Sequence, residues 1–336
     1  MNCIRSGRCY HRPNPTLPCS ALNTPAHTDT ASQVAILLAT YQGERYLSEQ
    51  LDSFARQTHA NWRVWASDDG STDNTLAILR RYQAQWAPGK LTILKGPALG
   101  SSRNFVSLTH NPGIQAAYYA YSDQDDIWED DKLARALAWL QTQDAGKPAL
   151  YCTRTRLVDA YNHEIGLSPN FRRPPSFANA LMQNITGGNT MVFNDAARRL
   201  LCMVDEDTEL VIHDWWVYLV VTASGGTVHF DPVPCLRYRQ HNDNLIGMSA
   251  KGQSLRSRIA KLFGPILKRN NDVHLRALQP LIPYMPPESR QLMAQFAAAR
   301  QRWLIPRIIG FKKAGLYRMT ASGNLGMVAA IVLNRL

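Results

Sequence analysis

Three acidic clusters in this 336-residue chain combine residue types and spacings that could carry out chemistry. In the first, Ser67–Thr75 (SDDGSTDNT), Asp68 and Asp69 follow an apolar stretch and precede Gly70. A turn followed by a helix cap would use the glycine and the later polar residues, but it does not need two adjacent carboxylates. A carboxylate can accept a hydrogen bond from a pyrimidine imide N–H or a ribose hydroxyl. Asp68 and Asp69 therefore predict nucleotide recognition, with a plain turn as the alternative.

The second cluster, Tyr121–Leu133 (YSDQDDIWEDDKL), follows another apolar stretch. Asp123 and Asp125 are two residues apart, and in an extended segment such residues project to the same side. Two carboxylates that face one point repel each other unless a cation lies between them, and a divalent cation would also bridge to diphosphate oxygens. The cluster predicts a site for Mg²⁺ or Mn²⁺. The alternative is a solvated acidic loop that caps the next helix.

The third cluster, His213–Val221 (HDWWVYLVV), places Asp214 where a helix is expected to begin. A carboxylate in this position can be a simple N-cap, which is the alternative to a catalytic role. His213 could orient or tune the carboxylate. The two tryptophans that follow fit a helix core, although one indole, Trp215, could stack on a sugar face.

Two further segments fit around these clusters. In Thr186–Asn189 (TGGN), Gly188 would let a sugar approach the backbone and Asn189 could hydrogen-bond to it, unless the glycines only form a turn. Arg239 and His241 alternate along an expected strand and therefore face one side. They could stabilise charge on a departing diphosphate. Arginine on an ordinary exposed strand is the alternative.

The elements that must position these residues alternate along the chain. An all-apolar strand is expected at Val34–Thr40, and Glu44–Thr58 has apolar residues at three- and four-residue steps, which is typical of a helix. Further strands are expected at 62–66, 91–94 and 117–121, and helices at 73–82 and 128–140. Beyond Lys147 the pattern is mixed, with strands at 150–158, at 190–193, near Val228 and near Cys235, and a helix at 214–223. This alternation predicts an α/β fold with a doubly wound, mainly parallel sheet, whose carboxyl edge would gather the acidic clusters.

The segments ATYQGERYLSEQLDS, DDGSTDNT and SDQDDIWEDDKL closely resemble the family 2 inverting glycosyltransferases of GT-A fold. SDQDDIW and the later HDWW are most similar to the rhamnosyltransferase-type branch, which builds bacterial surface polysaccharides. The resemblance runs from Val34 to about Gly247 and implies a GT-A doubly wound mixed sheet with a helical C-terminal appendage. It implies that Asp214 is the general base and that Asp125 is the likelier direct metal ligand. Nucleotide contacts are implied for Thr40, Tyr41, Asp68, Asp69 and Asp123.

The expected activity is transfer of a sugar, for which the branch suggests rhamnose, from a nucleotide-diphosphate donor to a hydroxyl of a glycan or lipid-linked acceptor. A sugar-phosphate nucleotidyltransferase is an alternative, but the Gly-rich, basic loop that usually follows its first strand is missing from ATYQGERY. A non-catalytic basic module that binds an anionic polymer is another alternative. The acidic clusters argue against it, and we expect no nucleic-acid partner.

Charge divides the chain unevenly. Residues 251–336 contain 15 Lys and Arg against Asp272 and Glu288, so their net charge is +13. Since the whole chain has a net charge of +11, the first 250 residues have a net charge of −2. We expect a leader without fixed structure at 1–33, a catalytic domain at 34–247 and a basic helical region at 248–336. The amphipathic stretch from Ser254 and the segment Gln301–Lys313, which again combines apolar, aromatic and basic residues, predict docking on an anionic membrane surface. Packing against the catalytic domain is the alternative.

The expected location is the cytoplasm, with peripheral contact on the cytoplasmic face of the inner membrane. The six cysteines lack the spacing of a secreted disulfide framework, which indicates a reducing compartment. The leader has no apolar run of signal-peptide length, and no window reaches the 18 apolar residues of a transmembrane helix.

Overall fold

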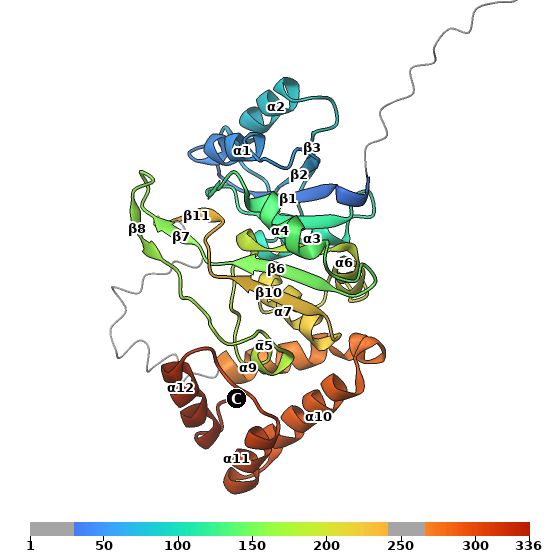
Figure 1. Ribbon diagram of the computed structural model, residues 1–336, viewed down its shortest axis with the longest axis vertical. Helices are drawn as coiled ribbons and strands as arrows, with labels where there is room; N and C mark the ends of the chain where they lie inside the picture. The colour runs from blue at the N-terminus through green and yellow to red at the C-terminus, as the bar shows by residue number, and fades with distance from the viewer. Residues whose placement is uncertain (1–29, 241–265) are drawn as a thin grey trace, which may run out of the picture.

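A seven-stranded mixed sheet forms the centre of the protein in the computed structural model, which describes residues 30–240 and 266–336 (Figure 1). Its strand order is β10-β6-β9-β4-β1-β2-β3, and β9 is antiparallel to both of its neighbours. The strands are β1 (Val34–Thr40), β2 (Trp62–Asp68), β3 (Leu91–Lys95), β4 (Tyr118–Ser122), β6 (Ala149–Thr153), β9 (Val192–Asn194) and β10 (Thr227–Asp231). The predicted α/β fold, with a parallel first half and a mixed second half, is confirmed.

Helices cover both faces of this sheet. The side chains of β1 alternate between the faces: Ile36 joins the hydrophobic cluster that includes α1, α2 and α4, whereas Leu37 joins the cluster that includes α3, α6 and α7. All of β1 is buried, which explains its uninterrupted apolar sequence. These helices are α1 (Leu47–Ala55), α2 (Thr75–Gln85), α3 (Ser101–His110), α4 (Lys132–Leu140), α6 (Asp195–Leu201) and α7 (His213–Ala223).

A second, four-stranded sheet has the order β5-β11-β7-β8 and changes two predicted boundaries. Its strands are β5 (Ile127–Trp128), β7 (Arg156–Val158), β8 (Glu164–Leu167) and β11 (Leu236–Arg239). The predicted helix at 128–140 begins only at Lys132, because Trp128 pairs with Leu236 as a strand residue. The predicted strand at 150–158 is two strands that belong to different sheets. Helix α3 was not predicted, since its sequence SSRNFVSLTH begins with four polar residues.

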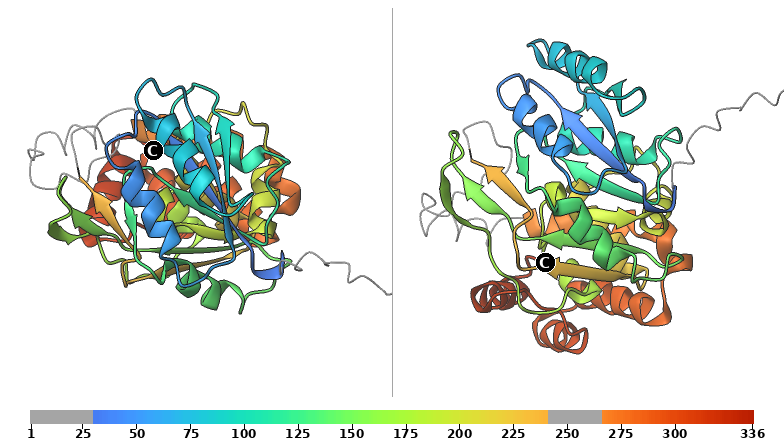
Figure 2. Two further views of the ribbon diagram at one scale, coloured as in Figure 1. Left: turned by 90° about the horizontal axis from the view of Figure 1, so that it is seen from above. Right: turned by 45° about the horizontal axis from the view of Figure 1, so that its top comes forward.

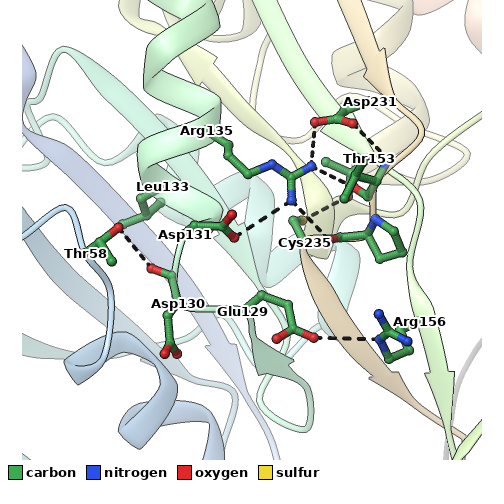
Figure 3. A network of polar contacts seen from close by, with 12 residues as sticks. Thr58, Glu129, Asp130, Asp131, Leu133, Arg135, Thr153, Arg156, Asp231 and Cys235 are labelled. Atoms are coloured by element: carbon green, nitrogen blue, oxygen red, sulfur yellow. Dashed lines mark hydrogen bonds and ion pairs between the residues drawn. The ribbon is translucent and has the colours of Figure 1, made fainter.

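Arg135 on α4 ties the acidic segment after β4 to the far strands (Figure 3). Its guanidinium lies 2.5 Å from an Asp231 carboxylate oxygen and 3.8 Å from Asp131, and it donates to the carbonyl of Pro234 at 3.1 Å. On the other side, the Thr58 N–H donates to the Asp130 carbonyl at 2.9 Å. Residues 129–131 are therefore held between α1 and the strands that follow α7.

The C-terminal helices lie at the end of the molecule opposite α1 and α2, and the right view of Figure 2 shows them gathered on one side of the sheet. They are α9 (Ile266–Ala277), η3 (Gln279–Tyr284), α10 (Pro287–Gln301), α11 (Leu304–Lys313) and α12 (Ala321–Val332). Their buried side chains, such as Ala277 and Phe296, share one hydrophobic cluster with α7. The rings of His274 and Trp215 meet with centroids 4.6 Å apart. Packing against the α/β part of the chain, the alternative to membrane docking, is present for these helices.

Several sequence predictions fall outside the described residues. They are the unstructured leader, apart from the short helix η1 (Thr30–Ser32), the domain boundary at 247 and most of the amphipathic stretch 254–269. Within the described parts of the chain, none of the helices is long and apolar enough to cross a membrane.

Candidate active site

The carboxyl ends of β2, β1 and β4 meet at one edge of the sheet, because β1 pairs in parallel with both other strands. Thr40 is level with Asp68 in the register, and Leu38 is level with Ser122, the residue before Asp123. The predicted convergence of the first two clusters is therefore present. Ligands of open α/β sheets bind at such an edge.

Asp68 and Asp69 are buried, with 4% and 7% of their surface exposed, and their carboxylates accept hydrogen bonds from the neighbouring loops. One oxygen of Asp68 accepts hydrogen bonds from the Thr40 hydroxyl at 3.0 Å and from the Ser71 hydroxyl at 2.6 Å. The two oxygens of Asp69 accept from the backbone N–H groups of Ala98 and Gly100, both at 2.7 Å. This pair thus shapes the turn after β2 and the start of α3. Each oxygen of Asp69 retains a lone pair, whereas the second oxygen of Asp68 also accepts two bonds, from the N–H groups of Gly70 and Ser71.

Gln124, in the middle of the second acidic cluster, joins that cluster to the loop after β1. Its side-chain oxygen accepts from the Tyr41 N–H and its nitrogen donates to the Tyr41 carbonyl, both at 2.8 Å. Gly43 leaves room for this contact, since a Cβ there would lie 2.3 Å from the Gln124 oxygen. The Tyr41 side chain is 57% exposed, so the amide fixes its backbone and leaves the ring open to a ligand.

The carboxylates of the second cluster repel one another. Burial and the negative charges of Asp125 and Asp214 raise the pKa of Asp123 to about 7. Burial and the charges of Asp125 and Asp123 raise the pKa of Asp126 well above its ordinary value. Asp123 and Asp125 are partly accessible, whereas Asp126 is fully buried. Negatively charged oxygen ligands fit a hard divalent cation, and the two accessible carboxylates are the ones that would hold it.

A buried polar network supports this cluster from below. The Asn189 side chain donates to a carboxylate oxygen of Asp126 at 2.5 Å, and the Asn189 carbonyl accepts from the Lys132 ammonium. Lys132 is fully buried, and its nitrogen lies 3.7 Å from the centre of the Trp128 ring. Burial lowers the pKa of Lys132 to about 8. Sequence reasoning missed Lys132 because a lysine at the start of a helix is normally solvated.

Asp214 lies in the first turn of α7, but it is not the N-cap, which is Ile212. Its carboxylate accepts from the Gly188 N–H at 3.2 Å and from the Trp215 N–H at 2.6 Å. Burial raises its pKa to about 6, although these hydrogen bonds act in the opposite direction. Since the charge of Asp214 is felt by Asp123, the third cluster shares the electrostatic environment of the second.

His213 does not orient Asp214 through a hydrogen bond. Neither ring nitrogen has a partner among the described residues, and the ring is stacked on Phe105 with centroids 4.2 Å apart. Burial lowers the pKa of His213 to about 3, so the ring is neutral. A Cβ on Gly188 would lie 2.6 Å from its Nε2, which means that the imidazole packs directly under the glycine that holds Asp214.

Other predicted site residues lie around this centre with their polar groups already engaged. Arg239 is 1% exposed, and its guanidinium contacts Glu49 at 2.9 Å and the Asp125 carbonyl at 3.1 Å. The indole N–H of Trp215 donates to the Ala180 carbonyl at 2.7 Å, on the side of the C-terminal helices. The sugar contacts of Gly188, Asn189 and Trp215 and the diphosphate contact of Arg239 stay predictions, and His241 lies outside the described residues.

The comparison with sequence families shows to which protein family the residues of this site belong. The model of Glycosyl transferase family 2 matches residues 35–201, which contain the first two acidic clusters and the Gly188 turn. These residues belong to glycosyl transferase family 2. The family domain thus covers both sequence motifs at the carboxyl edge of the sheet, while Asp214 comes from the part of the chain that follows it.

Relatives and solved structures agree with this family. The dTDP-rhamnosyl transferase RfbG of Shigella flexneri is 29% identical over 62% of this chain and 73% of its own length. An uncharacterized glycosyltransferase of Nostoc is 33% identical over 33% of this chain, but only 34% of its own length is matched.

S. aureus TarS 1-349 in complex with UDP-GlcNAc is 15% identical, with a TM-score of 0.50, over 85% of this chain and 93% of that one. GalNAc-T7 with UDP, GalNAc and Mn²⁺ is 10% identical with the same TM-score, over 85% of this chain and 55% of that one. The fold is that of the GT-A glycosyltransferases, as the sequence resemblance implied.

Proposed function

We propose that this glycosyltransferase works with inversion in bacterial surface polysaccharide synthesis and that Asp214 is its general base. The observation that carries this proposal is the buried Asp214 carboxylate, whose pKa of about 6 lies near neutral pH and whose charge reaches the acidic cluster. A base is most effective when its pKa is close to the working pH. Residues 34–247 would form the catalytic domain.

The donor is a nucleotide-diphosphate sugar, bound by Thr40, Tyr41, Asp68, Asp69 and Asp123. The exposed Tyr41 ring and the carboxylates at the ends of β2 and β4 support this assignment. We propose rhamnose as the sugar, on the basis of the 29% identity with the dTDP-rhamnosyl transferase RfbG.

A divalent cation, Mg²⁺ or Mn²⁺, is the proposed cofactor, held by Asp125 and Asp123. When bound, it would neutralise charge on the departing nucleoside diphosphate. Support comes from the mutual repulsion of these carboxylates and from the Mn²⁺ in the GalNAc-T7 structure. The described residues hold no group of three His, Cys, Asp or Glu side chains placed around a metal, so diphosphate oxygens and water would supply the other ligands.

The reaction is a direct displacement. Asp214 accepts the proton of the acceptor hydroxyl while the oxygen attacks the anomeric carbon, and the bond from that carbon to the diphosphate oxygen breaks on the opposite face. The N–H groups of Gly188 and Trp215 each donate to one oxygen of Asp214 and thereby fix the orientation of the carboxylate. Arg239 fixes the Asp125 carbonyl and thereby positions the cluster, and we retain it with His241 as a diphosphate contact.

The acceptor is a glycan or lipid-linked sugar near Gly188, Asn189 and Trp215. We propose that the enzyme meets it in the cytoplasm, at the inner membrane surface. The Trp215 indole touches α9 through His274, so the acceptor side of the site adjoins the basic C-terminal helices. A lipid-linked acceptor would be presented at such a surface.

Titration calorimetry with a panel of nucleoside diphosphates and nucleotide sugars, with and without Mn²⁺, tests the proposal together with a transfer assay. We expect metal-dependent binding of one nucleotide, lost in Asp125→Ala and retained in Asp130→Ala, an exposed acid of the same segment. Asp214→Asn should bind the donor without transferring sugar. Undiminished turnover in Asp214→Asn would remove the base role, and failure to bind any nucleotide would overturn the donor site.

Two alternative functions are less well supported. A sugar-phosphate nucleotidyltransferase would release pyrophosphate from a nucleoside triphosphate and does not match the family of residues 35–201. A non-catalytic basic module would act through the C-terminal region alone, but the helices of that region share their core with α7.

A further inference from the structure

The solvent-facing side of α11 is apolar over two turns. Leu304, Ile305, Ile308 and Ile309 are 41–56% exposed, whereas Phe311 and Ala314 on the other side are buried. Residues four apart share a helix face, so 304 and 308 continue to Lys312 while 305 and 309 continue to Lys313. The outer face of α11 is therefore an apolar stripe that ends in two exposed lysines, the reverse of an ordinary surface helix.

The neighbouring helix α12 repeats this feature. It contains no charged residue, and its exposed side chains Leu325, Val328 and Val332 are 73%, 51% and 44% exposed at three- and four-residue steps. Its opposite side is buried through Ala330 and Ile331. We call the exposed apolar side chains of α11 and α12, with Trp303 at the start of α11, the apolar face.

Arg307 fixes the two helices to each other. Its buried guanidinium donates to the Ile331 carbonyl near the end of α12 at 3.1 Å and to the Arg302 carbonyl before α11 at 3.0 Å. The inner sides of both helices belong to the cluster that contains α7. The apolar face is thus a fixed part of the fold, and it lies at the end of the molecule opposite α1 and α2 (Figure 1).

The charge around the apolar face favours an anionic partner. Residues 302–336 contain six Lys and Arg and no Asp or Glu, and Arg302, Lys312, Lys313 and Arg335 are exposed. A second copy of the chain seated on this face would bring these positive groups together without a counter-charge. Helices of 10 and 12 residues are about 15–18 Å long, half of a hydrocarbon core, so they suit the membrane interface.

We infer that the apolar face of α11 and α12 inserts into the interface of an anionic membrane, with Lys312 and Lys313 against the lipid phosphates. This inference rests on the proposed function, because a lipid-linked acceptor gives the contact its purpose. The sequence predicted the contact from the stretch 254–269 and from Gln301–Lys313, and the inference places it on the exposed side of α11, which lies in the second segment, and on α12. Insertion of these helices would bring the Trp215 side of the active site towards the acceptor.

Vesicle flotation of the full chain tests the inference. The variant is Ile305→Glu/Val328→Glu, at 56% and 51% exposure, and its matched control is Ile165→Glu/Val233→Glu, at 54% and 56% exposure elsewhere on the surface. With vesicles of phosphatidylglycerol and phosphatidylcholine, we expect the wild type and the control to float. The variant should bind about tenfold more weakly or worse, because two carboxylates would enter the apolar layer. Lys312→Glu/Lys313→Glu should abolish the preference over pure phosphatidylcholine.

Unchanged melting temperatures would show that the variants fold. The rate of sugar transfer to a water-soluble acceptor, measured in each variant, separates this inference from the proposed function. Vesicle binding lost with transfer intact supports the inference. Equal flotation of Ile305→Glu/Val328→Glu and wild type overturns it, as does a wild type that never floats. A wild type that instead forms a dimer abolished by the same variant would assign the face to a second copy. Absence of transfer in every variant would fault the proposed function alone.

Discussion

Asp214→Asn should separate catalysis from stability. A general base contributes about 10²–10⁴-fold to the rate, so the variant should lose activity by about that factor while it still binds the donor. For the wild type, kcat/KM should fall about tenfold for each pH unit below 6, because only the ionised carboxylate can accept a proton and its pKa is about 6.

The same residue should destabilise the folded enzyme at neutral pH. Its pKa rises from 3.8 in the unfolded chain to about 6 in the folded protein, so the folded state favours the protonated form. The group has no unfavourable effect below pH 3.8 and destabilises fully above pH 6, where the difference reaches about 3 kcal/mol. Between pH 5 and pH 8 the change is about 1.4 kcal/mol.

Asparagine cannot ionise, so Asp214→Asn should lack this pH-dependent loss. Urea unfolding of both proteins at pH 5 and pH 8 measures it: the stability of the variant relative to wild type should increase by about 1.4 kcal/mol at the higher pH. The comparison of two pH values removes any constant effect of the lost N–H acceptor. A difference that stays flat, or that falls as pH rises, would refute the argument that burial raises the pKa of Asp214.

Other changes test the remaining contacts. Asp125→Ala should abolish Mn²⁺-dependent donor binding in calorimetry without lowering the melting temperature, and metal-independent binding would contradict its role as a ligand. Gly188→Ala places a Cβ 2.6 Å from the His213 ring and should lower kcat about tenfold or more with little change in donor KM, whereas full activity would mean that the turn adjusts freely. Gln124→Ala removes two hydrogen bonds to Tyr41 and should raise the donor KM about tenfold in steady-state kinetics. An unchanged KM would show that the Tyr41 loop keeps its conformation without the Gln124 side chain. Chelation by EDTA should stop transfer reversibly, with activity restored by Mn²⁺.

The parallel half of the fold could be predicted because its strands are buried on both faces and read as apolar runs. Val34–Thr40 was predicted with the observed boundaries. The motif Asp68-Asp69 and the cluster after β4 could be placed at one edge, since parallel neighbours end together. The part of the site that lies at strand ends was thus open to sequence reasoning.

What could not be predicted depends on tertiary contacts. Helix α3 begins where Asp69 holds the Gly100 N–H, a contact between residues 31 apart that leaves no local pattern. For Arg239, no local pattern indicates that its guanidinium is buried against Glu49, on a helix 190 positions earlier. The charge of a residue does not indicate whether its side chain is solvated or buried. The partners of Arg239 could therefore be identified only in the structure.

The short turn Gly188–Thr190 has a consequence for how this enzyme can be altered. The backbone N–H of its first residue holds Asp214, the proposed base, and the side chain of its second residue holds Asp126, beside the proposed metal ligands. A substitution that shifts the turn therefore disturbs donor activation and acceptor deprotonation together, so neither can be retuned there alone. Changes of donor preference, in evolution or by engineering, should instead accumulate in the loop around the exposed Tyr41 ring, which is anchored through Gln124 and not through this turn, so that a new side chain there leaves Asp214 undisturbed.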